Sequence, residues 1–453
     1  MAYFTINKLY SEILARIFAI SNAKSPCVSS STQRHALSDI LLVCTRWYNI
    51  AVNTPPLWSH VDISIKRWGR ASCLHGPEVW LSRSSSLPIH VHIADPYPNE
   101  FPWSEVDPDA AALFGSMTVS SLRPHIARIR SLTIFGMWMS PAARAIFAAH
   151  PAPAWASLKM LDIREVGCDD LDSSGTLKIS SLAKLLELDL SILSCSPMWP
   201  SMNEICELLS NCPEMHTLRL GSDVPVDQLT STRQEPIFMP GLKVLEISTA
   251  GAPLLSRLQT QSSELDLKLS GFWPDHMYPD SLTTLQSFLA RSRVAALTLR
   301  EPNHRHELFS TLLPQIWTVL PCLRCLCFDA TVLEPDVLEP ATLMTLDFGS
   351  CFPNLKYFCI AHTLLGPESI SQLNTILATV QVEHLFFFAC RFTSPMTEAL
   401  YPDMDGWGIG EIPEDIKHSI LGLARQVVVR PSWSRLSEYY GVDPFTREML
   451  QQD

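Results

Sequence analysis

The stretch Leu323-Arg-Cys-Leu-Cys-Phe328 carries apolar side chains at its first, fourth and sixth positions, and this pattern decides the fold. The same hexamer occurs nine times, at start-to-start spacings of 29, 27, 30, 27, 52, 29, 32 and 27 residues. The spacing of 52 is about two periods, so we expect a further unit around residues 265–267. Each hexamer predicts a short strand whose apolar side chains are buried only by stacking on neighbouring units. The nine hexamers are Ile129–Ile134, Leu158–Ile163, Leu185–Leu190, Met215–Leu220, Leu242–Ile247, Val294–Leu299, Leu323–Phe328, Leu355–Ile360 and Val382–Phe387.

A period near 28 residues with this core is typical of a leucine-rich repeat. We therefore predict an α/β fold, in which a small helical module is followed by a leucine-rich-repeat solenoid with strands on its concave side and helices on its convex side. Helical spacing of apolar residues is clearest at 142–149, 202–210, 282–290, 308–320 and 370–379. The predicted divisions are a helical module at 1–65, a linker and N-terminal cap at 66–109, the solenoid at 110–395 and a C-terminal cap at 396–453.

The composition of the chain excludes several classes of function. The chain has 453 residues, 47% of them apolar, and a net charge of −12. This acidic balance argues against nucleic-acid binding and against adhesion to anionic membranes. The 13 cysteines show no disulfide-framework spacing, and no charge-free apolar run reaches membrane-spanning length. We therefore expect a cytoplasmic or nuclear protein without nucleic-acid or membrane partners.

Two helical patterns precede the repeats. Apolar positions at 9, 13, 14, 17 and 18 predict a first helix, and a second pattern runs from Leu37 to Ala51. The polar segment 21–35 between them reads as a loop, and the sequence Asn53-Thr54-Pro55-Pro56 ends the second helix. Alternating runs predict strands at 61–65 and 89–93, and a short helix is expected at 77–83.

These residues resemble an F-box. That family's motif has a first helix of the form Leu-Pro-x-Glu-Ile/Leu-Leu-x-x-Ile-Phe, a helix carrying Val-Cys-x-x-Trp and a closing Leu-Trp pair. The segment from Trp80 to Pro88 is similar to one that follows the F-box in many fungal F-box proteins with leucine-rich repeats. Tyr10 departs from the motif, since the family usually has proline there. The matching residues are Leu9, Glu12, Ile13, Leu14, Ile17, Phe18, Val43, Cys44, Trp47, Leu57 and Trp58.

The resemblance implies that the module docks a Skp-type adaptor, which connects it to a cullin ubiquitin ligase, while the repeats hold a protein substrate. A module of about 50 residues buries only a modest share of its surface, so two apolar helices leave side chains over for a partner. The alternative is that these residues are simply the core of a small helical cap. The candidate adaptor-binding residues are Leu9, Ile13, Leu14, Ile17, Phe18, Val43, Trp47, Leu57 and Trp58.

Residues between the buried hexamer positions are expected on the concave face, because side chains alternate along a strand. In the first units these residues are polar and mostly acidic, which would steer basic targets. In the last units they are apolar and aromatic, and two interpretations stay open. This end either anchors a substrate or is covered by the C-terminal segment with Trp407, Trp433 and Tyr439. The candidate substrate-binding residues are Tyr357, Cys359, His384, Phe386 and Phe388.

No motif for catalysis stands out in the sequence. There is no phosphate-binding Gly-x-x-x-x-Gly-Lys-Ser/Thr loop, no His-Glu-x-x-His and no Gly-x-Ser-x-Gly. Cys322, Cys325 and Cys327 lack a second pair at zinc-site spacing. We therefore expect no catalytic residue, cofactor or metal. Two rivals remain: a repeat scaffold or inhibitor with a non-functional F-box, and a hydrolase hidden in the irregular C-terminal residues.

Overall fold

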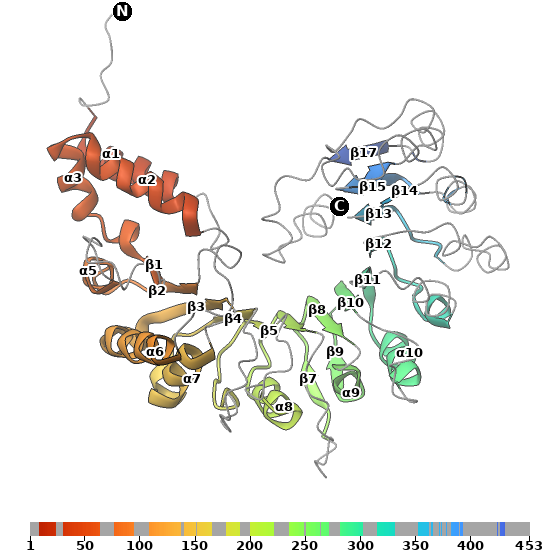
Figure 1. Ribbon diagram of the computed structural model, residues 1–453. Coiled ribbons are helices and arrows are strands. Elements are labelled where there is room, and N and C mark those ends of the chain that lie inside the picture. Colours follow the sequence, from red (N-terminus) through yellow and green to blue (C-terminus); the bar gives the residue numbers. More distant parts are fainter. Residues whose placement is uncertain are drawn as a thin grey trace, which may run out of the picture. The chain divides into compact units, whose positions relative to one another are not determined.

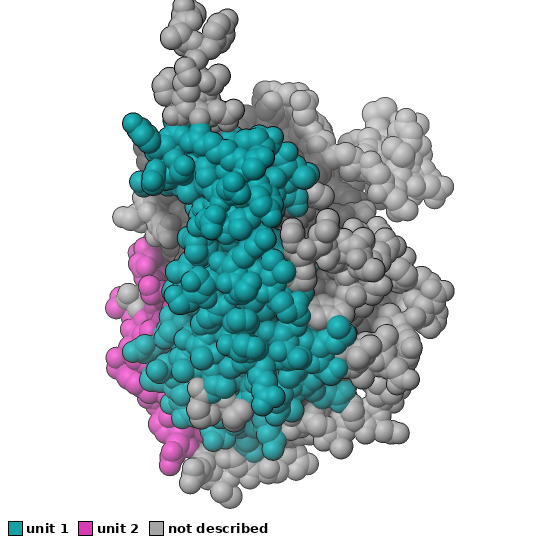
Figure 2. All heavy atoms as spheres, turned by 90° about the vertical axis from the view of Figure 1, so that its left-hand side faces the viewer, with its two compact units in different colours: residues 1–215 teal, residues 216–453 magenta. Residues whose placement is uncertain are grey.

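The computed structural model divides the chain into two compact units, residues 1–215 and 216–453 (Figures 1 and 2). Each unit contains parallel strands with helices on one side of them. The structure describes residues 9–23, 30–63, 77–94, 108–136, 140–150, 152–164, 178–190, 200–221, 235–248, 251–262, 264–270, 281–301, 315–330, 352–361, 364–365, 371, 373, 377, 382–388, 390–392, 424 and 426–430.

The first unit begins with a helical module. It comprises α1 (Ser11–Ala23), α2 (Ser30–Val43), α3 (Thr45–Val52) and the 3-10 turn η2 (Pro55–Trp58). These elements close around one apolar cluster, because the first, second and last of them each contribute large side chains to it. The buried members are Leu14, Phe18, Leu37, Ile40, Ala51, Leu57 and Trp58.

Two sequence-based expectations for this module are wrong. The helix predicted from Leu37 to Ala51 is two helices, because Cys44 adopts an extended conformation (φ −164°, ψ 166°) and ends α2 before α3 begins. The segment predicted as a loop at 21–35 contains the last residues of α1 and the first of α2. The first expectation failed because the apolar periodicity continues across the break at Cys44. The second failed because the Ser-rich start of α2 has the composition of a loop.

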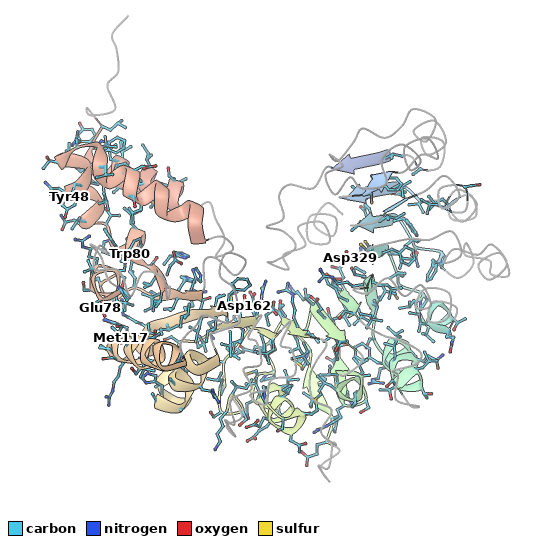
Figure 3. All side chains as sticks on the ribbon, in the orientation of Figure 1. Tyr48, Glu78, Trp80, Met117, Asp162 and Asp329 are labelled. Atoms are coloured by element: carbon cyan, nitrogen blue, oxygen red, sulfur yellow. The ribbon has the colours of Figure 1, made fainter. Side chains whose placement is uncertain are left out.

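Trp58 joins the helical module to the strands that follow it. Its indole nitrogen donates a hydrogen bond to the Ala51 carbonyl at 2.8 Å. Its ring meets the ring of Trp80 edge-on, with centroids 4.9 Å apart, and the Arg83 guanidinium lies 4.4 Å from its centroid. Trp80, labelled in Figure 3, and Arg83 belong to α5 (Pro77–Arg83), so the closing residue of the F-box-like motif packs against the next helix.

A second joint lies at the end of α5. The Arg128 guanidinium donates hydrogen bonds to the carbonyls of Leu81, Ser85 and Leu87 and to the hydroxyl of Ser84. The carbonyls at a helix C-terminus lack partners inside the helix, and a cation there also suits the helix dipole. Arg128 therefore fixes the end of α5 on the turn that precedes the first hexamer strand.

The first unit carries parallel strands in the order β1-β2-β3-β4-β5. The expected strand at 61–65 is β1, which lies in the segment assigned to the helical module and pairs with β2. The expected strand at 89–93 is β2. The elements after η2 are β1 (His60–Ile63), α5, β2 (Ile89–Ala94), α6 (Pro108–Leu122), η4 (Arg123–Arg128), β3 (Ile129–Phe135), α7 (Ser140–Ala149), η5 (Ala152–Trp155), β4 (Met160–Arg164), β5 (Glu187–Leu190) and α8 (Met202–Asn211).

The second unit continues the same alternation, with strands in the order β6-β8-β10-β11-β12-β13-β15-β17. The unit expected around 265–267 is confirmed as β10. Its elements are β6 (Thr217–Leu220), β7 (Ile237–Met239), β8 (Val244–Ser248), α9 (Ala252–Leu255), β9 (Leu258–Thr260), β10 (Leu265–Ser270), α10 (Ser281–Arg291), β11 (Val294–Glu301), η8 (Trp317–Val319), β12 (Cys325–Ala330), β13 (Tyr357–Ala361), β14 (Leu364–Leu365), β15 (His384–Phe388), β16 (Arg391–Phe392) and β17 (Gln426–Arg430).

The repeat prediction is therefore confirmed in its central feature. Every quoted hexamer forms a strand that pairs in parallel, and the helices expected at 142–149, 202–210 and 282–290 are α7, α8 and α10. The helices expected at 308–320 and 370–379 lie mostly outside the described residues. The sheet also runs past the predicted end of the solenoid at residue 395, because β17 pairs with β15.

Repeat-to-repeat hydrogen bonds accompany the stacking. The Ser248 hydroxyl donates to the Gly221 carbonyl at 2.8 Å, and the Cys390 thiol donates to the Ile360 carbonyl at 3.2 Å. Ser248 is the last residue of β8 and Gly221 follows β6, whereas Cys390 follows β15 and Ile360 lies within β13, so each bond joins one unit to the unit before it. Cys390 thus links two units.

Replacing Trp58 with alanine should destabilise the first unit by roughly 3–5 kcal/mol, because the large buried ring and its hydrogen bond are both lost. Chemical denaturation followed by circular dichroism measures this change. The exposed Tyr48 on α3 serves as a control, and its alanine variant should stay within about 0.5 kcal/mol of the parent. Equal effects from the two substitutions would contradict the role given to Trp58.

Candidate interaction surfaces

One apolar surface lies on α1 of the helical module. Ile13, Ile17 and Ile20 are all exposed, at 45%, 38% and 51%, although they lie on one side of the helix at spacings of four and three residues. Leu14 and Phe18, one position further along the chain, are buried in the module core. The apolar part of α1 is therefore wider than the module can cover, and half of it faces outward.

A second group of exposed apolar side chains lies near the junction of α2 and α3. Leu42, Val43 and Tyr48 are exposed, Leu42 most strongly. Leu42 and Val43 are the last residues of α2, just before the break at Cys44. Ile20, Leu42 and Tyr48 were missed as candidates, because the motif match directed attention to its own positions. Their helical phase on α1 and their place beside the break are the signals that could have found them.

The predicted adaptor-binding residues divide into two sets. Ile13, Ile17 and Val43 are exposed, as a docking surface requires. Leu14, Phe18, Leu57 and Trp58 are buried in the core and contribute by holding the helices. Leu9 and Trp47 are partly buried against that core, with the Trp47 ring 4.8 Å from the ring of Phe18.

The Tyr10 departure leaves the start of α1 intact. The Tyr10 carbonyl accepts hydrogen bonds from the amides of Ile13 and Leu14, both at 3.1 Å, so this residue stands at the helix N-terminus and not inside it. Its side chain is exposed. Proline and tyrosine can both supply that carbonyl, and the substitution therefore adds an aromatic ring to the exposed surface of the module.

The second candidate surface is the sheet face opposite the helices, which we call the inner face. Parallel pairing places its side chains in continuous rows about 4.8 Å apart. In the first unit the register gives two rows. The first row, nearer the start of each strand, is His60, His90, Ser131, Met160 and Glu187. The second row, two residues further along each strand, is Asp62, His92, Thr133, Asp162 and Asp189.

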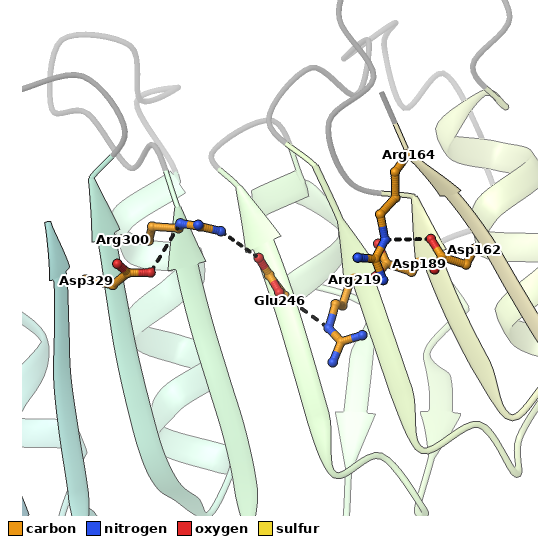
Figure 4. Close-up of polar contacts among 7 residues, drawn as sticks. All are labelled: Asp162, Arg164, Asp189, Arg219, Glu246, Arg300 and Asp329. Atoms are coloured by element: carbon orange, nitrogen blue, oxygen red, sulfur yellow. Dashed lines mark hydrogen bonds and ion pairs between the residues drawn. The ribbon is translucent and has the colours of Figure 1, made fainter. Parts of the chain in front are cut away.

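Ion pairs cross these rows in the first unit. The Arg164 guanidinium bridges two carboxylates, with 2.7 Å from Nε to Asp162 Oδ1 and 2.9 Å from a terminal nitrogen to Asp189 Oδ2 (Figure 4). His92 Nδ1 lies 2.8 Å from Asp62 Oδ1. All of these side chains are nearly buried. His60 and His90 stack beside them, with ring centroids 4.6 Å apart.

The inner face of the second unit starts with a charged network. Glu246 on β8 lies 3.5 Å from Arg219 on β6 and 4.0 Å from Arg300 on β11, and Arg300 is 3.2 Å from Asp329 on β12 (Figure 4). The carboxylates of Glu246 and Asp329 are therefore offset by arginines, a pairing that the sequence-based expectation of mostly acidic first units did not include. The acidic residues of the hexamers are visible in the sequence. Their pairing with arginines of neighbouring units depends on the strand register, which the sequence does not show.

Further along the second unit the same face becomes apolar. Tyr357, His384 and Phe386 form a group of rings with centroids 5.0 to 6.5 Å apart. Cys325 packs with Tyr357, and Cys327 with Cys359 and Ala361, and the Phe386 ring contacts both groups. The candidates Tyr357 and Cys359 are buried, whereas His384 and Phe386 are partly exposed. The Phe388 side chain and residues 396–423 and 431–453, which include Trp407, Trp433 and Tyr439, lie outside the described residues, so the substrate-anchor and cap interpretations both stay predictions.

Metal binding finds no support in the described part of either surface. Among the described residues no cluster of three or more His, Cys, Asp or Glu side chains is placed to hold a metal ion. Within the same ranges, no helix is both long and apolar enough to cross a membrane.

Cys212 illustrates the structural role of the cysteines. Its thiol follows α8 and donates a hydrogen bond to the Leu182 carbonyl at 3.3 Å. Burial raises its pKa, a shift that backbone hydrogen bonds and Lys159 only partly oppose. A buried, protonated thiol is a poor nucleophile, so this residue serves packing.

Comparisons with known proteins identify no family. No family model matches the chain, and no curated protein matches it. Among solved structures it is similar to an internalin from Listeria monocytogenes, with a TM-score of 0.26 and 12% identity over 93% of this chain and 95% of that one. This likeness is weak. The assignment of a leucine-rich-repeat fold rests on the hexamers, their strand order and their register.

Changing Arg164 to methionine should destabilise the first unit by about 3–5 kcal/mol, because Asp162 and Asp189 would remain buried without their cation. Thermal and urea unfolding measure the loss. A triple variant that also carries Asp162→Asn and Asp189→Asn should regain most of the lost stability, because no buried carboxylate is then left without its cation. A single variant as stable as the parent would show that the bridge is not formed.

The Cys212 thiol should react slowly with iodoacetamide at neutral pH, and its labelling should increase only at pH values above those that label an ordinary thiol. Partly exposed Cys44 and Cys322 provide the comparison. Peptide mass spectrometry after timed alkylation of the native protein reads out each site. Early labelling of Cys212 would contradict its burial.

Proposed function

We propose that this chain is the substrate-recruiting subunit of a Skp-cullin-F-box ubiquitin ligase. In this proposal the helical module binds a Skp-type adaptor, the repeats hold a target protein, and the chain itself catalyses nothing. The repeats would bring the target near the transfer machinery and so raise its effective concentration there. Cytoplasm or nucleus is the compartment that this role requires.

The observation that carries the proposal is the exposed apolar stripe of α1. Large aliphatic side chains in a helix normally turn into the core, yet Ile13, Ile17 and Ile20 face outward beside a core that is already filled by Leu14 and Phe18. An exposed apolar stripe on a well-packed module is a typical protein-binding surface. Two of its three residues, Ile13 and Ile17, are positions of the F-box-like motif, which supports an adaptor as the partner.

The second candidate function is a repeat scaffold or inhibitor that docks no adaptor. Tyr10 favours it, because an exposed aromatic ring at the start of α1 stands where F-box sequences usually have proline. Both functions use the repeats in the same way. They differ only in what covers α1.

Changing Ile13 and Ile17 together to aspartate should reduce affinity for a purified Skp-type adaptor by at least about 100-fold, because charges would enter an apolar contact. Isothermal titration calorimetry with the full chain measures it. These positions are exposed, so the module should stay folded. Trp47 is less suitable, because its ring packs against Phe18 and its loss would disturb the core.

Arg16→Asp makes the same change in net charge at an exposed polar position next to the stripe, and it should weaken adaptor binding far less than the isoleucine pair, because no apolar contact is lost. A parent chain that binds no Skp-type adaptor would support the scaffold instead. Binding that survives both isoleucine substitutions would place the docking surface elsewhere.

A further inference from the structure

Three basic residues follow one another along the edge of the first unit where its strands begin. All strands of a parallel sheet start at the same edge, and Arg130, Lys159 and Lys184 stand at or just before the starts of β3, β4 and β5. The Lys159 amide donates to the Arg130 carbonyl at 2.8 Å, and the Leu186 amide donates to the Lys159 carbonyl at 2.7 Å. The two lysines also lie beside the Cys212 thiol, whose burial-raised pKa is partly lowered by backbone hydrogen bonds, one of them from Lys184, and by the charge of Lys159. We call the three residues the basic edge.

The basic edge is accessible to a partner. Arg130 and Lys184 are exposed, and Lys159 is half-buried. Within the described part of the chain, none of the three side chains forms a hydrogen bond or an ion pair. The Glu187 amide donates to the Lys159 carbonyl at 3.1 Å, yet the Glu187 carboxylate forms no ion pair with Lys159. The three charges are therefore available to a group from outside the chain.

Other basic residues of this protein show what a structural role requires. Arg128 and Arg291 each donate hydrogen bonds to carbonyls near a helix C-terminus, and Arg164 bridges two aspartates. The basic edge does neither. Arg130 and Lys159 are also register neighbours on strands about 4.8 Å apart, where like charges destabilise the sheet. A pair that weakens the fold and has no structural role suits a surface that receives an anionic partner.

The dimensions and composition of the basic edge favour an acidic protein segment over nucleic acid. Three cations on consecutive strands span roughly 10 Å, which matches two or three carboxylates of an extended peptide, since its same-side side chains repeat about every 6.8 Å. Half-buried Leu186 follows Lys159 in the same row and offers an aliphatic contact. The net charge of −12 on the whole chain repels a long polyanion such as nucleic acid.

We propose that the basic edge binds a short acidic segment of a partner protein. Arg130, Lys159 and Lys184 pair with its carboxylates, and Leu186 contacts one of its apolar side chains. This inference names a class of target for the repeats and rests on their proposed role in holding a protein. It is independent of adaptor docking, which uses α1.

The test measures binding of the full chain to a short fluorescent peptide of alternating Glu and Ala, by fluorescence anisotropy. A peptide of alternating Gln and Ala is the negative probe, and an oligothymidine of the same net charge as the Glu-Ala peptide tests nucleic acid. We expect the Glu-Ala peptide to bind most tightly of the three, and its binding to weaken between about 0.05 M and about 0.5 M salt.

Two double variants separate the basic edge from the remaining charges of the chain. Arg130→Gln with Lys159→Gln should weaken binding of the Glu-Ala peptide about 10-fold or more, because two charge-assisted hydrogen bonds are lost. Its unfolding midpoint should be unchanged or higher, since the repulsion between neighbouring strands is removed. Arg16→Gln with Arg144→Gln makes the same charge change on α1 and α7 and should have little effect on peptide binding.

The proposal is overturned if the parent chain fails to bind the Glu-Ala peptide, if the edge variant binds it at parent affinity, or if the control pair weakens it as much. Tighter binding of the oligothymidine, or a lower unfolding midpoint of the edge variant, also overturns it. Adaptor binding by the same variants keeps the two proposals apart. Lost peptide binding with a bound adaptor defeats only this inference, whereas peptide binding without any adaptor defeats only the ubiquitin-ligase role.

Discussion

Burial of each hexamer's apolar side chains by the next unit is the constraint on which the rest of the structure depends. A strand of four to eight residues has too little surface to form a core alone, so Leu161 or Leu245 is covered only because strands lie on both sides of it and helices lie behind it. Hydrogen bonds such as that from Ser248 to Gly221 reinforce this stacking from unit to unit. The parallel register follows, and it is nearly continuous within each unit.

The same constraint determines what the inner face presents. Once the apolar positions are fixed in register, the intervening side chains must form rows, whatever their chemistry. This is why Arg164 meets carboxylates from two strands and why Arg300 lies between Glu246 and Asp329. It also brings Tyr357, His384 and Phe386 together at the far end of the second unit. A repeat protein thus obtains a patterned surface from the spacing of its core residues.

Sequence patterns predicted the parts of this protein that depend on local periodicity. Hexamer positions, the missing unit at β10, helices α7, α8 and α10, and the apolar nature of α1 could all be read from residue spacing. The break at Cys44 was missed because apolar periodicity continued across it. Ion pairs between strands were missed because they join residues 25 to 54 positions apart, whose proximity depends on register and not on composition. Burial likewise divided the motif residues, since helical phase decides whether Ile17 or Phe18 turns inward.

The central claim is that two separate surfaces of one chain hold two different proteins. Amide hydrogen exchange of the full chain, alone and with a purified Skp-type adaptor, tests it most directly. The account predicts slower exchange in α1 and around the junction of α2 and α3, with the strands from β3 to β17 unchanged. Protection of the repeat strands with α1 unchanged would contradict it.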